Sequence, residues 1–222
     1  MVDTTDVLEA FSALRAARPV FHSEADFQHA LAWEMQRRCE SWRVRLETAI
    51  SLQANPTRRI HLDLHIRDPR DGTSVAVELK YPTAELEVDD EHEEYRLASQ
   101  GAQDLIRYDV LKDIGRIEQL VSEGKATSGI AILLTNDPLY WQAPKHGRPT
   151  NADAFRLHQG LTISGCLDWG PATGDGTKSR ERNAAIELHG TYLLDWKDYS
   201  RLDGDRGRFR YLTALVQEPG QA

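Results

Sequence analysis

The stretch that decides the fold is Arg59-Ile-His-Leu-Asp-Leu-His-Ile-Arg67, followed by Asp68-Pro-Arg-Asp-Gly72 and Thr73-Ser-Val-Ala-Val-Glu-Leu-Lys-Tyr81. Apolar and polar residues alternate strictly in its first part, which is the pattern of a half-buried strand with one apolar face. That predicted face consists of Ile60, Leu62, Leu64 and Ile66. The third part alternates as well, and the proline and the Asp-Gly pair between them are turn residues. We therefore predict a β-hairpin.

Three charged side chains share one surface of this predicted hairpin. Asp63 lies on the polar face of the first strand, and Glu78 and Lys80 point the same way from the second because they are two residues apart. Two carboxylates suit a hard cation such as Mg²⁺, which takes oxygen ligands and keeps several waters. Such a cation activates water, and a lysine can orient that water or stabilise charge on the phosphate. The pattern points to metal-assisted hydrolysis of a phosphodiester.

The spacing of these residues resembles the PD-(D/E)XK nuclease superfamily. Asp63 is followed by fourteen residues and then by Glu78-Leu79-Lys80, although Leu62 stands where the family name has proline, which carries no ligand. The resemblance implies a restriction-endonuclease-like αβββαβ core with a mixed central sheet flanked by helices. It also implies that Asp63 and Glu78 are metal ligands, that Lys80 is catalytic, that the cofactor is Mg²⁺ or Mn²⁺, and that the substrate is nucleic acid, with DNA expected.

Two other interpretations stay open. Glu-x-Lys on a strand is also typical of a solvated cross-strand charge pair, and an aspartate near a hairpin is also typical of turn chemistry. The formal net charge of -8 argues against a broad electrostatic grip on nucleic acid. The alternative function is a non-catalytic protein of the same fold that acts by binding, in a defence, toxin-immunity or regulatory assembly.

Two helices are predicted before the sheet, over residues 2–18 and from Ser23 onward. Ser23 and Asp26 are close to a capping box, and the second helix places Glu24 in line with an apolar stripe that includes Phe27 and Leu31. The resemblance implies that Glu24 joins the site as a third carboxylate and catalytic residue. Alternatively, Glu24 complements the helix dipole in the first turn.

The rest of the predicted core follows in order. Residues 43–52 are predicted as a strand, 82–95 as a strongly acidic loop or hairpin beside the site, 98–122 as a long helix, and 128–135 as a buried strand. The resemblance implies that Gln103 and Arg107 near the start of the long helix bind the substrate phosphate. Surface pairing of Arg107 with Asp104 is the alternative.

Composition and length set the wider frame. The chain of 222 residues predicts a nuclease-like core over residues 1–138 and a loop- and strand-rich extension over residues 139–222, packed on the same domain. The distant Cys39 and Cys166 predict a reducing cytoplasm rather than a disulfide scaffold. Because the sequence lacks a membrane-spanning apolar run and a signal pattern, we expect no membrane association. A homodimer is a further expectation, since many relatives of the resembled superfamily cut both strands as dimers.

Overall fold

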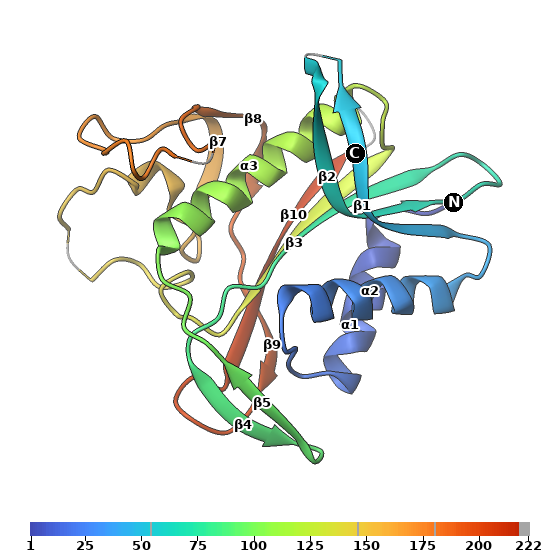
Figure 1. Cartoon of the computed structure of the whole chain (residues 1–222), viewed down its shortest axis with the longest axis horizontal. Coiled ribbons are helices and arrows are strands. Elements are labelled where there is room, and N and C mark those ends of the chain that lie inside the picture. The colour runs from blue at the N-terminus through green and yellow to red at the C-terminus, as the bar shows by residue number, and fades with distance from the viewer. Residues whose placement is uncertain (54, 146, 180, 218–222) are drawn as a thin grey trace.

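The computed structural model describes residues 1–53, 55–145, 147–179 and 181–217 and shows a mixed α/β architecture (Figure 1). The first elements are α1 (Thr4–Ala17), α2 (Glu24–Arg38), β1 (Arg43–Leu52), β2 (Asn55–Arg67), β3 (Ser74–Lys80), β4 (Leu86–Asp90) and β5 (Glu93–Leu97). They are followed by α3 (Gln103–Ser122), β6 (Ser128–Thr135), the short 3₁₀ helix η1 (Asp153–Phe155), β7 (Thr162–Leu167), β8 (Ile186–Leu193), β9 (Lys197–Arg201) and β10 (Arg208–Gln217). The predicted succession of helix, three strands, helix and strand is present, with the β4–β5 hairpin inserted before α3.

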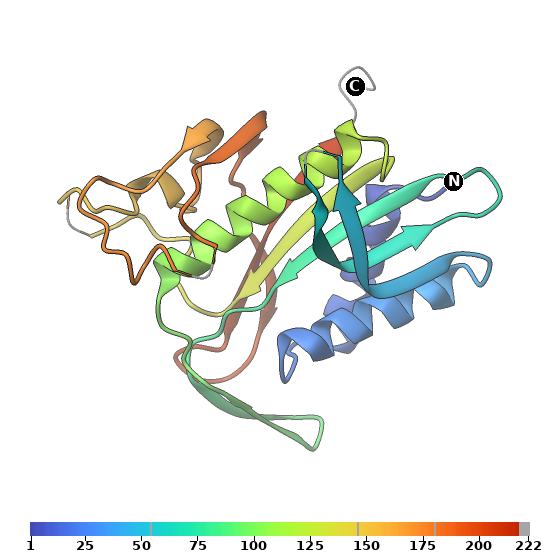
Figure 2. The same ribbon diagram turned by 45° about the horizontal axis from the view of Figure 1, so that its top comes forward.

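A mixed central sheet organises the chain. Its strand order is β1-β2-β3-β6-β10-β9, in which β3 and β6 pair in parallel and the other neighbours pair antiparallel. Parallel neighbours need a crossover connection, which α3 provides. Helices α1 and α2 cover one face of the sheet, and α3 covers the other (Figures 1 and 2). Each face therefore has its own apolar core.

The β2–β3 hairpin is confirmed, but its predicted single apolar face is wrong. All of the predicted apolar residues of β2 are buried, yet Ile60 and Leu62 pack in the core under α3, whereas Leu64 and Ile66 pack in the core under α1 and α2. The change of face occurs around Asp63. At this point the regular pairing of β1 with β2 is interrupted at Glu47, whose backbone φ of 51° lies in the left-handed region. Because of this distortion, β2 contributes apolar side chains to both cores.

The C-terminal extension contributes strands to two different sheets. Strand β10 pairs with β6, and β9 pairs with β10, so this part completes the central sheet. Strands β7 and β8 form a separate pair that lies against α3. The buried carboxylate of Glu118 on α3 accepts hydrogen bonds from the backbone N–H groups of His189 and Gly190 and from the Tyr192 hydroxyl. Helix α3 is consequently held between two sheets.

The segment between β3 and α3 is a hairpin rather than an irregular loop. Strands β4 and β5 pair antiparallel over the acidic stretch, and its base is buried through Leu86, Tyr95 and Leu97. Helix α3 begins at Gln103, later than predicted, because Ala102 adopts the left-handed conformation at the N-cap position. No helix within the described residues has the length and apolar content needed to cross a membrane.

Candidate active site

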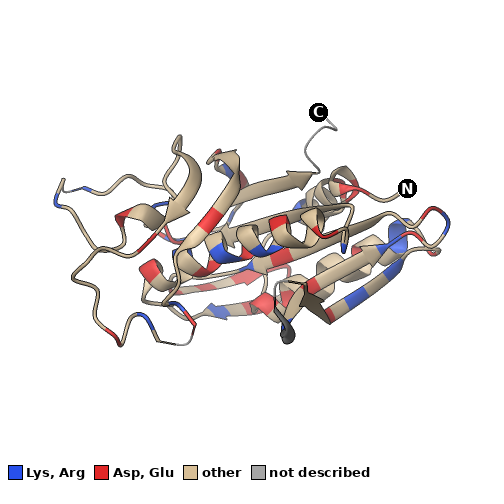
Figure 3. Cartoon of the chain, turned by 90° about the horizontal axis from the view of Figure 1, so that it is seen from above, with Lys and Arg blue, Asp and Glu red and all other residues tan. Residues whose placement is uncertain are grey.

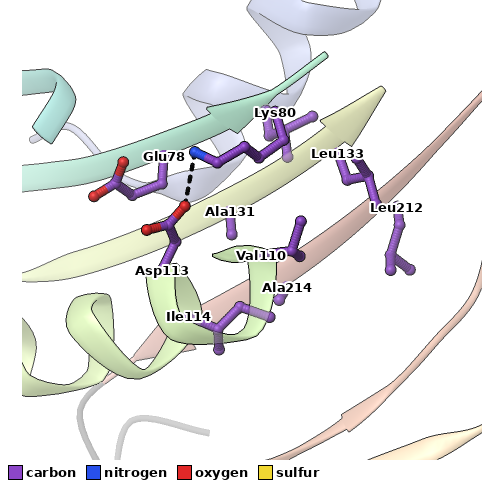
Figure 4. Close-up of a pocket in the computed structure, with 10 residues that line it drawn as sticks. Glu78, Lys80, Val110, Asp113, Ile114, Ala131, Leu133, Leu212 and Ala214 are labelled. Carbon is purple, nitrogen blue, oxygen red and sulfur yellow. Dashed lines mark ion pairs between the residues drawn. The ribbon is translucent and has the colours of Figure 1, made fainter. Parts of the chain in front are cut away.

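Strand β3 presents Glu78 and Lys80 toward α3. Its alternate residues Val77 and Leu79 are fully buried under α1 and α2, so the intervening positions face the opposite layer. Glu78 is only 3% exposed, and Lys80 is partly exposed at the end of the strand. Both side chains border a small space between α3 and the sheet (Figure 4). The rest of its lining is mostly apolar, from Val110, Ile114, Ala131, Ile132, Leu133, Leu212 and Ala214.

The side-chain carboxylates of Asp63 and Glu24 both contact backbone N–H groups at the C-terminal end of β3. The β2–β3 ladder runs as far as the pair Leu64 and Val77, so the N–H groups beyond it need other acceptors. Asp63 Oδ2 accepts from the N–H of Leu79 at 2.6 Å, and Glu24 Oε2 accepts from the N–H of Tyr81 at 2.8 Å. Two carboxylates from β2 and α2 therefore flank Lys80 in place of a neighbouring strand.

Helix α3 adds two charged residues that the sequence analysis missed. Asp113 Oδ2 lies 2.8 Å from Lys80 Nζ, an ion pair drawn in Figure 4. Arg116 Nη1 lies 2.7 Å from Asp113 Oδ1 and 3.8 Å from Glu78 Oε1. Both residues flank the apolar stripe formed by Val110, Ile114 and Ile117, and an acid beside a buried stripe is the signal that could have indicated Asp113.

Gln28 on α2 supports Asp63 from outside the cluster. Its side-chain amide donates to Glu47 Oε1 at 2.8 Å and to the backbone carbonyl of Asp63 at 2.7 Å. These bonds bridge the two strands where the β1–β2 ladder is distorted. The Glu47 side chain thus points toward Gln28.

Burial and like charge disfavour ionisation of the carboxylates. Burial raises the pKa of Asp63 and of Glu24, although Glu24 lies at the solvent-exposed edge of the cluster. The pKa of Glu78 is raised well above its ordinary value, first by burial and then by the charge of Asp113. Burial acts in the opposite direction on Lys80, but the carboxylates led by Asp113 outweigh it and raise the pKa of the ammonium. The four carboxylates of the cluster outnumber its two cations, Lys80 and Arg116.

The donor atoms suit a divalent cation. Asp63, Glu78 and Glu24 offer carboxylate oxygens, and Glu78 Oε1 is buried without a hydrogen-bond donor among the described residues. Within those residues no group of three or more His, Cys, Asp or Glu side chains is arranged to hold a metal ion. Mg²⁺ is usually bound by one or two protein carboxylates together with water and substrate phosphate, and Asp63 and Glu78 match that number.

Gln103 and Arg107, predicted to bind substrate, contact a different part of the molecule. Gln103 Nε2 donates to Asp137 at 3.0 Å, and Arg107 donates to the carbonyl of Leu139, both on the segment after β6. They line a separate surface hollow instead of the space beside Glu78 and Lys80. The alternative given above, a surface pairing of Arg107 with Asp104, is not among the ion pairs of the described residues.

Comparisons with models of known protein families, with curated proteins and with solved structures found no match to this chain. Fold and site together define the chain as a mixed α/β protein with a cluster of carboxylates and one lysine at the C-terminal end of β3, an interior strand of its central sheet. Among the residues predicted for the site, Asp63, Glu78, Lys80 and Glu24 are brought together, while Gln103 and Arg107 are not.

Proposed function

We propose that the protein is a metal-dependent nuclease that hydrolyses phosphodiester bonds, with DNA as the expected substrate and a restriction-endonuclease-like core. One observation carries the proposal: Asp63 and Glu24, from separate elements, bind the backbone on either side of Lys80, two residues from the buried Glu78. The parallel β3–α3–β6 crossover, which presents Glu78 and Lys80 at one end, also supports it. An ordinary surface charge pair would not be buried in this way.

The residues divide into distinct roles. Asp63 and Glu78 would hold Mg²⁺ or Mn²⁺, with Glu24 as a third carboxylate at the open edge. Such a cation supplies a water of lowered pKa and offsets charge on the phosphate oxygens. The Lys80 ammonium would donate a hydrogen bond to the attacking water or to a phosphate oxygen, and its raised pKa keeps it charged at neutral pH. Asp113 is a positioning residue, because it fixes the Lys80 ammonium by an ion pair.

Charge distribution limits how the substrate is held. The formal net charge is -8, and acidic and basic positions intermingle on α3 rather than forming one basic face (Figure 3). Affinity for nucleic acid should therefore be modest and should depend on a bound cation at the site. The preference for DNA over RNA and the homodimeric state remain predictions.

The test is cleavage of plasmid DNA, single-stranded DNA and RNA by the purified chain with Mg²⁺, Mn²⁺ or a chelator. We expect metal-dependent cleavage that Asp63→Asn and Lys80→Ala reduce by at least about 100-fold. Lys125→Ala is the matched control, since Lys125 is exposed and lies outside the site. Circular dichroism must show that each variant is folded. Wild-type activity in a folded Lys80→Ala variant would rule out the mechanism.

A binding function without catalysis is the second candidate. It is favoured by the ion pair between Lys80 and Asp113, which leaves the ammonium already engaged by the protein. This alternative predicts that the folded chain cleaves none of the three polymers under any metal condition. It also predicts that a partner recovered by the wild-type chain is retained by Lys80→Ala.

A further inference from the structure

Arg107 is a buried cation that has no carboxylate within ion-pair distance among the described residues. The residue is only 8% exposed, and its contacts are the Leu139 carbonyl and the Tyr140 ring, whose centre lies 5.6 Å from the guanidinium carbon. Its Nε is buried without a hydrogen-bond acceptor, and it forms no ion pair with a carboxylate within the described part of the chain. A buried charge without a counter-charge is costly, so such an arginine is usually completed by an anion.

The hollow beside Arg107 has the size and lining for that anion. Its volume is about 470 Å³, and it is an open surface hollow lined by the first turn of α3 and by parts of residues 139–177. Arg156, oriented by an ion pair with Asp153 at 2.9 Å, contributes a second guanidinium. Hydrogen-bonding side chains complete the polar lining, at Gln103, Thr150, Asn151, Thr173 and Thr177. Asp104 is the one acid in the described lining.

Two further features favour negative charge at this position. The positive end of the α3 dipole points to its first turn, and no side chain caps that turn among the described residues because Ala102 is the N-cap. The like charges of Arg107 and Arg156 also disfavour each other, and burial together with Arg156 lowers the pKa of Arg107. An oxyanion between the two guanidiniums would relieve both effects.

We infer that this hollow is a phosphate-binding site formed by Arg107, Arg156 and the first turn of α3, separate from the carboxylate cluster. Arg107 and Asp113 are six residues apart, or about 9 Å along the helix axis. That distance spans two to three nucleotides at roughly 3.4 Å per step. The phosphate can therefore come from a nucleic-acid backbone or from a free phosphate compound. Phosphate binding does not depend on the proposed hydrolysis.

The experiment uses the full chain in chelator, so that the carboxylate site stays without a divalent cation. Calorimetric titrations use inorganic phosphate in one arm and, in the other, a short single-stranded oligonucleotide without terminal phosphates. We expect Arg107→Gln to weaken binding of at least one probe by 10-fold or more. Arg67→Gln, the same charge change at an exposed position of β2, should stay within twofold. The arm with tighter Arg107-dependent binding identifies the source of the phosphate.

A second measurement shows where phosphate binds, and it tests the inference even if Arg107→Gln does not fold. Trp169 lines the hollow, whereas Trp33 is exposed on α2, so phosphate should shift the indole NMR signal of Trp169 and leave that of Trp33 in place. Arg156→Gln should weaken binding about three- to tenfold. The inference is overturned if neither probe binds, if both arginine variants bind like wild type, or if only Trp33 responds. None of these outcomes bears on whether the wild-type chain cleaves DNA, so a failure of this inference is distinguishable from a failure of the proposed function.

Discussion

Glu78 is the residue at which function and stability oppose each other most directly. Its carboxyl is buried, its pKa is raised by burial and by Asp113, and its nearest cation is Arg116 at 3.8 Å. A carboxyl whose pKa is higher in the folded state favours folding at low pH and disfavours it as the pH rises through the folded pKa. At neutral pH the ionised form therefore costs stability, at about 1.4 kcal/mol for each pKa unit.

We predict that Glu78→Gln raises the melting temperature at neutral pH and abolishes cleavage. A gain of 1 kcal/mol corresponds to about 2–4 °C for a chain of this size. The gain should shrink as the pH is lowered, because wild-type Glu78 then becomes neutral too. Calorimetric melting at several pH values measures it. A variant that melts lower than wild type at pH 8 would show that the pair with Arg116 dominates.

Asp113 acts through Lys80, and its removal should be seen in a pH profile. We predict that Asp113→Asn lowers the cleavage rate by roughly 10–100-fold, the range for groups that orient a metal site from outside. Burial lowers the pKa of Lys80 and Asp113 is the largest effect that raises it, so the alkaline limb of the profile should move to lower pH. Asp109→Asn is the matched control on the same helix, because Asp109 pairs with Arg182 instead. If the alkaline limb did not move, the proposal that Asp113 acts through Lys80 would be contradicted.

At the scale of elements, regular patterns were predictable and irregular contacts were not. The alternation of residues 59–81 and the unbroken apolar run of 128–135 correctly predicted β2, β3 and β6, because burial on one or both faces shapes such sequences directly. Strand β9 was missed, since only Tyr199 within it is buried and its polar sequence lacks an apolar face. The sequence placed Asp63, Glu78 and Lys80 on one surface but did not indicate Asp113, because Asp113 comes from a helix far along the chain and no local pattern joins it to Lys80.

The packing of α3 on β6 depends on one glycine. A Cβ at Gly129 would lie 2.2 Å from Ile117 Cγ2 and 3.0 Å from the carbonyl of Ala76. We predict that Gly129→Ala destabilises the protein by about 1–3 kcal/mol through overpacking. Urea unfolding measures the change. Gly101→Ala is the control, because its Cβ would meet no atom within 4 Å, and equal stability of the two variants would contradict the close approach of α3.

At the scale of the whole molecule, the proposed function requires an acidic chain to bind a polyanion. The net charge is -8, and the β4–β5 hairpin concentrates carboxylates in the segment that follows Lys80. Repulsion between exposed charges is screened beyond about 10 Å at 0.1 M salt. The hairpin should therefore oppose binding at low ionic strength and matter little at high ionic strength.

We predict that Glu85→Gln combined with Glu87→Gln, which changes the net charge from -8 to -6, tightens nucleic-acid binding several-fold at low salt. Fluorescence anisotropy at two salt concentrations measures the effect, which should vanish at 0.5 M salt. Glu40→Gln with Glu187→Gln makes the same charge change at exposed positions away from the hairpin and from the hollow beside Arg107. A similar gain in that control would assign the effect to net charge alone.

The hydrogen bonds from Leu79 and Tyr81 to Asp63 and Glu24 have a consequence for the study of homologous chains. These two acids complete the backbone pairing of β3, so a descendant that had lost its chemistry would still need them to keep the strand end satisfied. Lys80 Nζ donates to the carbonyl of its neighbour Leu79, but within the described residues neither Lys80 nor Glu78 accepts a backbone N–H at the strand end as Asp63 and Glu24 do. Their retention or loss, rather than that of Asp63, should separate active homologues from inactive ones.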